Sequence, residues 1–179
     1  IRIPKVESVD TVRFVLDRLD RAGCSAVVVV PNLETARGVW HAADIAGGGP
    51  RVLAIAFGGV DFYRDVAAEP TPDALETLYA RSRLVLASRV AGIRPPIDSV
   101  YVRLDDDAGL HHLAEQSRAL GFFGKGAIHP RQIPIINAVF TPSAEQVARA
   151  REIVDTYQAD SANGKGASVT ASGDFIDIP

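Results

Sequence analysis

Two carboxylates follow two strongly apolar segments of the chain and lie 27 positions apart. Glu34 comes after residues 27–30, and Asp61 comes after residues 53–57. Both segments are hydrophobic enough to be buried strands, and an acid directly beyond a buried strand is unfavourable unless it is solvated, paired or bound to a cation. Hard divalent cations such as Mg²⁺ often take only one or two carboxylate ligands. The two acids therefore predict a metal site; the alternative is an N-cap role for Glu34 and a salt bridge or turn for Asp61.

Four further residues lie at the ends of expected strands. Gly58 and Gly59 precede Asp61, and glycines let backbone N–H groups approach a ligand closely, so we expect them to border a substrate. Glu7 either orients a ligand or supplies negative charge to the first turn of a helix. His129 is either a general base or ligand, or a hydrogen-bonded structural histidine. No histidine has a partner at metal-ligand spacing, so we do not expect zinc.

Alternating strands and helices position these residues. We expect strands at 2–6, 25–30, 52–57, 99–104 and 124–128, and helices at 8–21, 34–46, 73–91, 107–120 and 141–158. Residues 134–140 are either helical or irregular. Such βα units imply an α/β fold with a parallel sheet. A complete (β/α)₈ TIM barrel needs about 250 residues, so 179 residues fit about its last five units. We expect barrel units over 1–140, a C-terminal helix over 141–158 and a flexible tail or lid over 159–179.

Composition narrows the function classes. The net charge of −3 provides no basic field for nucleic acid or an anionic membrane. No apolar run approaches the roughly 20 residues that span a bilayer. The single cysteine, Cys24, cannot form an internal disulfide, which fits a reducing compartment such as the cytoplasm. Arg81, Arg83 and Arg89 predict a basic helix face that either contacts phosphates or is solvated or part of an interface.

Seven segments together resemble one family. They are residues 4–8, 31–38, 57–62, 79–83, 128–133, 140–143 and 175–179, and they span the chain in order. In this combination the chain is similar to the citrate lyase beta-subunit-like family, a branch of the HpcH/HpaI aldolase/citrate lyase superfamily of metal-dependent aldolases and acyl-CoA lyases. The resemblance implies a (β/α)₈ barrel that assembles as a homotrimer or hexamer.

The resemblance also implies a reaction. Glu34 and Asp61 would bind Mg²⁺, with Mn²⁺ as a substitute, and Asp177 would be the acid/base on a C-terminal lid that closes over a neighbouring subunit's site. Family members cleave or form a carbon–carbon bond between an acyl-CoA and a 2-oxoacid, so coenzyme A enters as part of the substrate. Two other functions stay open: a class II pyruvate-type aldolase acting without coenzyme A, and a non-catalytic subunit that retains the fold.

The sequence departs from the family pattern in two respects. The acidic pair and the arginine that the family carries in its first three strands have no counterpart here. Asn32 stands where the family usually has an apolar residue. The chain also begins in the middle of an expected strand and contains no methionine. We therefore expect it to be the later part of a larger protein.

Overall fold

The computed structural model describes residues 1–163, 166–170 and 172–177, and the side chain of Asp177 lies outside this description. The chain divides into two compact units, Ile1–Phe140 and Thr141–Pro179. Within the described residues, no helix has both the length and the apolar character needed to cross a membrane.

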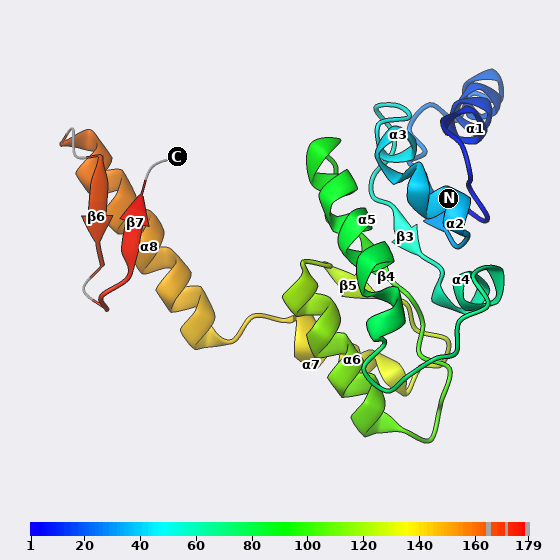
Figure 1. The fold of residues 1–179 in the computed structure, drawn as a ribbon. Helices are drawn as coiled ribbons and strands as arrows, with labels where there is room; N and C mark the ends of the chain where they lie inside the picture. Colours follow the sequence, from blue (N-terminus) through cyan, green and yellow to red (C-terminus); the bar gives the residue numbers. More distant parts are fainter. Residues whose placement is uncertain (164–165, 171, 178–179) are drawn as a thin grey trace. The chain divides into compact units, whose positions relative to one another are not determined.

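A five-stranded, fully parallel sheet forms the centre of the first unit, with the strands in sequential order β1-β2-β3-β4-β5. Figure 1 labels β3, β4 and β5 of this sheet. The strands are β1 (Arg2–Ile3), β2 (Val30–Leu33), β3 (Ala56–Phe57), β4 (Ile97–Asp98) and β5 (Gly124–Lys125). Strands β1, β3 and β5 are shorter than expected, β2 is shifted to end three residues later, and β4 lies just before the strand expected over 99–104. The α/β class and the parallel sheet are as expected.

Helices connect the strands. They are α1 (Val9–Arg21), α2 (Ala36–Trp40), α3 (Ala42–Ala46), α4 (Gly59–Asp65), the 3₁₀ turn η1 (Leu75–Thr77), α5 (Leu78–Val90), α6 (Asp107–Leu120) and α7 (Gln132–Phe140). Helix α6 has the predicted bounds because both its ends are fixed locally. The Asp106 carboxylate accepts the N–H of Gly109 at 2.8 Å, and Gly121 ends the helix with φ +102°, which favours glycine.

The alternation of side chains along β2 places the core residues and the candidate site residues on opposite faces of the sheet. Leu33 pairs in register with Phe57, and both belong to the buried core that helices α3 and α5 complete with Ile45 and Leu84. Side chains along a strand point alternately to opposite faces. Asn32 therefore faces away from this core, and Glu34, two residues on, follows it.

Three expected elements differ from those observed. The helix expected over 34–46 is divided into α2 and α3 at His41. Residues 58–72, for which no helix is expected, contain helix α4. The strand expected over 99–104 is not formed: β4 occupies the two residues before it. The last backbone bond of β4 toward β5 is the N–H of Gly126 donated to the Asp98 carbonyl at 2.9 Å, and no ladder pairing of the described residues lies beyond it. Val100 and Val102 alternate as in a strand, but this segment has no neighbouring strand to pair with among the described residues.

The second unit consists of one helix and one hairpin. Helix α8 (Ala144–Ala162) starts with a capping box formed by Ser143 and Gln146. Strands β6 (Ala167–Val169) and β7 (Phe175–Asp177) pair antiparallel, and the Arg149 guanidinium contacts both carboxylate oxygens of Asp174. The described part of 159–179 therefore contains ordered elements where the sequence predicts a flexible tail.

Candidate metal and substrate site

Glu34 lies directly beyond the end of β2 and is only 6% exposed. Its Oε1 accepts the backbone N–H of Lys5 at 2.8 Å, and its Oε2 accepts a hydrogen bond from the Asn32 side chain. A carboxylate has about four acceptor positions, and the hydrogen bonds from the described residues occupy two of those on Glu34. Glu34 does not cap α2, because the Thr35 hydroxyl takes that role by accepting the N–H of Gly38 at 3.1 Å. The N-cap alternative for Glu34 is therefore wrong.

Gly58 forms the wall against which Glu34 rests. A Cβ built on Gly58 would lie 2.4 Å from both Cβ and Oε2 of Glu34, and 2.8 Å from the Asn32 amide nitrogen. Only glycine allows β3 to approach the Glu34 carboxylate this closely. The N–H groups of both glycines have protein partners: Gly58 donates to the Leu33 carbonyl at 3.0 Å and Gly59 to the Ser99 hydroxyl at 2.9 Å.

Asp61 lies in the first turn of α4 and is half-buried. The Lys5 ammonium is 3.7 Å from its Oδ1, so the salt-bridge alternative for Asp61 describes a contact that the structure contains. Lys5 thus touches both predicted ligands, Glu34 through its backbone and Asp61 through its side chain. Lys5 was not predicted as a site residue, although it stands two residues before Glu7 in one of the segments that carry the family resemblance.

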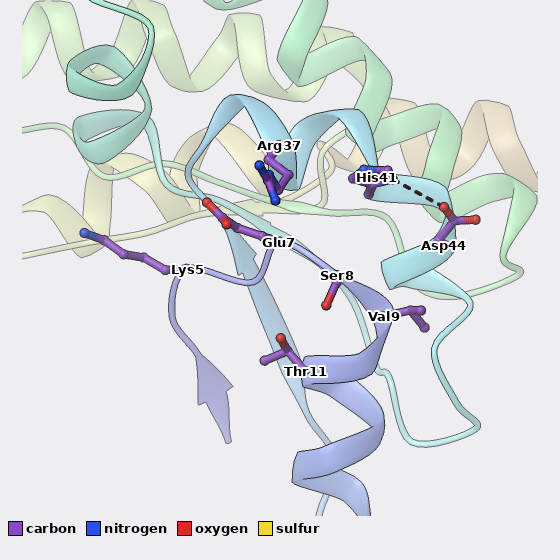
Figure 2. A pocket seen from close by; sticks show the side chains of 8 residues that line it. All are labelled: Lys5, Glu7, Ser8, Val9, Thr11, Arg37, His41 and Asp44. Atoms are coloured by element: carbon purple, nitrogen blue, oxygen red, sulfur yellow. Dashed lines mark ion pairs between the residues drawn. The ribbon is translucent and has the colours of Figure 1, made fainter.

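A cavity of about 390 Å³ lies beside these residues, between the N-terminal end of α1 and helices α2 and α3 (Figure 2). Its lining includes Lys5, Glu7, Arg37 and His41. Glu7 is partly exposed and immediately precedes Ser8, the N-cap of α1, which suits the alternative in which it supplies charge near the helix start. In Figure 2 the Lys5 side chain extends away from His41, whose ring pairs with a neighbouring aspartate.

His129 has a structural contact. It is exposed, and its Nδ1 accepts the backbone N–H of Arg131 at 3.2 Å, closing the turn before α7. The buried Gln132 ties the same turn to the segment after β4: its Oε1 accepts the N–H of Ile128 at 3.0 Å, and its Nε2 donates to the Tyr101 carbonyl at 2.8 Å. The hydrogen-bonded alternative thus fits His129.

A buried ionic cluster was not expected from the sequence. The Asp98 carboxylate of β4 pairs with Arg81 of α5 at 3.1 Å and with Lys125 of β5 at 2.9 Å, and it accepts a hydrogen bond from Ser117 of α6. All three charged side chains are at most 3% exposed. The prediction of a solvated or interface position for Arg81 is therefore wrong. The spacing of arginines along the helix suggested a surface position for Arg81. Its partners Asp98 and Ser117 are distant in the sequence, so the spacing could not reveal that they enclose its guanidinium.

The cluster shifts the ionisation of its members. Burial favours the neutral form of Asp98, but the neighbouring Lys125 and Arg81 charges outweigh it and hold the pKa of Asp98 below its ordinary value. Burial lowers the pKa of Lys125, and Asp98 offsets part of that shift. The three charged groups join two strands to helix α5, and Ser117 adds helix α6, so the cluster is a structural feature of the sheet.

The residues present fit a hard divalent cation. Glu34 offers open acceptor positions against the Gly58 wall, and Asp61 offers a half-exposed carboxylate nearby on α4. Oxygen donors of this kind suit Mg²⁺, which keeps several waters and so needs few protein ligands. Among the described residues there is no group of three or more His, Cys, Asp or Glu side chains that could hold a metal ion, so any cation here would use these two acids with other oxygens. Asp177, the predicted acid/base, has its side chain outside the described residues.

The five sequential parallel strands, their connecting helices and the acids at the strand ends define the chain as a βα-repeat protein. The HpcH/HpaI aldolase/citrate lyase family matches residues 1–130. The chain belongs to this family.

Named relatives match over the whole chain. It is 32% identical to the mitochondrial citramalyl-CoA lyase of Homo sapiens, covering 100% of this chain and 56% of that protein. It is 36% identical to the citrate lyase subunit beta-like protein of Deinococcus radiodurans, covering 99% and 61% respectively. The chain therefore spans less than two thirds of the length of these relatives.

Solved structures of related proteins also match most of this chain. RipC from Yersinia pestis matches with a TM-score of 0.75 and 34% identity over 82% of this chain and 65% of that one. Protein CitE from Mycobacterium tuberculosis, in complex with magnesium, acetoacetate and coenzyme A, matches with a TM-score of 0.73 and 28% identity over 99% of this chain and 62% of that one.

Proposed function

We propose that the protein is a Mg²⁺-dependent carbon–carbon lyase, which cleaves or forms a hydroxyacyl-CoA such as malyl-, citramalyl- or citryl-CoA. The products of cleavage would be an acyl-CoA and a 2-oxoacid. The observation that carries this proposal is the buried Glu34 carboxylate, held against Gly58 at the strand ends and linked through Lys5 to Asp61. The family membership and the magnesium, acetoacetate and coenzyme A bound to the related CitE support it.

Glu34 and Asp61 would hold the Mg²⁺, which supplies Lewis-acid polarisation of the oxoacid carbonyl when bound. Gly58, Gly59 and Glu7 would border the substrate. In cleavage, a base would take the hydroxyl proton and the oxygen would become the carbonyl of the 2-oxoacid as the carbon–carbon bond breaks. The electron pair of that bond would pass to the α-carbon of the acyl-CoA, giving the enolate of the thioester. Asp177 would then deliver a proton to that carbon, or remove one in the reverse direction.

For the whole protein we propose a (β/α)₈ barrel, of which the five parallel strands form part, in a homotrimer or hexamer located in the cytoplasm. The C-terminal unit that carries Asp177 would act as the lid over a neighbouring subunit's site. This assembly rests on the family resemblance, and sedimentation velocity of the intact protein would test it.

Isothermal titration with Mg²⁺ tests the site. Wild type should bind, and Glu34→Gln and Asp61→Asn should each lose most of the affinity. Asp44→Asn is the matched control, because Asp44 lines the neighbouring cavity and pairs with His41. Equal binding by all four proteins would refute the ligand assignment.

Turnover of malyl-CoA and citramalyl-CoA, compared with the free hydroxy acids, separates the three possible functions. Cleavage of thioesters alone supports the lyase. Cleavage of free acids indicates an aldolase acting without coenzyme A. No turnover by the intact protein, together with an Asp177→Ala variant that affects only stability, indicates a non-catalytic subunit.

A further inference from the structure

Lys5 has an unusual backbone conformation. Its φ angle is +48°, in the left-handed region that residues with a side chain seldom adopt. Such conformations persist where the surrounding structure fixes them, and they are frequent at ligand sites. Here the next residue, Val6, is fixed by its N–H bond to the Asn32 carbonyl at 3.1 Å. The turn therefore directs the N–H of Lys5 at the Glu34 carboxylate, 2.8 Å away.

The two contacts of Lys5 differ in how firmly they are held. The backbone N–H belongs to a turn anchored on β2. The ammonium lies at the end of a flexible four-carbon stem, with the side chain 64% exposed, and contacts Asp61 at 3.7 Å. An exposed ion pair at this distance is weak and easily exchanged. The ammonium can thus leave Asp61 while the backbone bond to Glu34 is retained.

A lysine ammonium and a divalent cation are alternative positive partners for the Asp61 carboxylate. We propose that Lys5 is a substrate-binding residue whose ammonium is displaced from Asp61 by the bound cation and then pairs with the carboxylate of a 2-oxoacid. This inference rests on the proposed function, since it requires a cation at Glu34 and Asp61. The positive partner of the substrate carboxylate would then be Lys5, the residue that contacts both Glu34 and Asp61.

Calorimetry on the full chain tests both steps. Lys5→Met removes the ammonium and keeps the stem and the backbone N–H, Lys5→Arg keeps the charge, and Lys5→Gln serves if the methionine variant unfolds. Arg37→Met is the control, because Arg37 lines the same cavity and is no partner of Asp61 among the described contacts. Each protein is titrated first with Mg²⁺ and then, at saturating Mg²⁺, with pyruvate.

We expect Lys5→Met to bind Mg²⁺ about two- to fivefold more tightly, the range of an exposed ion pair that no longer competes. The same variant should bind pyruvate about tenfold more weakly, because a charge-assisted hydrogen bond is lost. Lys5→Arg should restore pyruvate binding, and Arg37→Met should resemble wild type in both titrations.

The failures are distinguishable. If wild type and Lys5→Met bind Mg²⁺ and pyruvate equally while Glu34→Gln binds no Mg²⁺, the metal site stands and the role of Lys5 is overturned. Weaker Mg²⁺ binding by Lys5→Met also overturns it, since the lysine would then support the cation. If wild type binds no Mg²⁺, the proposed function fails, and the displacement of Lys5 fails with it.

Discussion

Replacing Gly58 by alanine should disrupt the site through a single methyl group. The added Cβ would lie 2.4 Å from the Glu34 Cβ. Carbon atoms in contact are normally about 3.5–4.0 Å apart, so the methyl group would be about 1 Å too close. The Glu34 Cβ is attached to the backbone at the end of β2 and cannot rotate away. The strand ends must therefore separate, or Glu34 must move as a whole.

Two magnitudes follow from this clash. Overpacking of this kind typically destabilises a protein by about 1–3 kcal/mol. Displacement of the Glu34 carboxylate should also weaken Mg²⁺ binding by at least about tenfold, equivalent to about 1.4 kcal/mol. The free energy of unfolding can be measured in urea through Trp40, the single tryptophan of the chain, which lies in the first unit. Mg²⁺ affinity can be measured by calorimetry on the same samples.

Gly47→Ala is the matched control for this substitution. Gly47 follows α3 with φ −81°, and the nearest atom to an added Cβ is the Ala43 carbonyl oxygen at 3.5 Å, an ordinary contact. Alanine should be tolerated there, with a change within about 1 kcal/mol. If Gly58→Ala unfolds and binds Mg²⁺ as Gly47→Ala does, the close packing of Gly58 on Glu34 plays no part in the site.

Three more predictions concern stability, measured by the same fluorescence assay. Asp98→Asn leaves two buried cations without their shared carboxylate and should lower the free energy of unfolding by about 3–5 kcal/mol. Lys125→Met leaves Asp98 paired with Arg81 and should lower it less. Equal losses in the two variants would contradict this ordering. Because the pKa of Asp98 is lowered in the folded state, its contribution is complete above about pH 4 and is lost as the pH falls through the lower folded value. Wild type should therefore lose stability in acid more steeply than Asp98→Asn. Asn32→Leu removes the donor to Glu34 Oε2 and should lose about 1–3 kcal/mol; an unchanged urea midpoint would count against this contact.

Local signals predicted the parts of the fold that local interactions determine. Helix α6 has its expected bounds because Asp106 and Gly121 fix its ends within a few residues of sequence. The expected strand at 99–104 failed for the opposite reason. Valines at alternate positions indicate a strand, but a strand also requires a partner, and pairing is set by residues distant in the chain. Helix α4 was not expected because it begins at Gly59, and glycine favours turns over helices.

The acids of the site were visible because strand ends are recognisable in the sequence. Their supporting residues were not. Lys5 joins Glu34 to Asp61 through a left-handed backbone conformation, which nothing in a lysine predicts. Asn32 was noted only as a departure from an apolar family position, and the structure makes it a hydrogen-bond donor to Glu34. A polar residue that replaces an apolar one beside a buried acid is the signal that could have identified it.

The buried ionic cluster and the candidate metal site are also connected through the sheet. Ser99 follows Asp98 directly, and its hydroxyl accepts the N–H of Gly59, the first residue of the helix that carries Asp61. A change at Asp98 that shifts the end of β4 would therefore reach Asp61 through one hydrogen bond. Loss of activity in an Asp98 variant would not make Asp98 a catalytic residue, because its carboxylate is bound among Arg81, Lys125 and Ser117. If Asp98 has a structural role, the folded fraction of an Asp98 variant should bind Mg²⁺ more weakly, and the loss of affinity should grow with the displacement of α4. Ser99→Ala should weaken Mg²⁺ binding while leaving the ionic cluster intact.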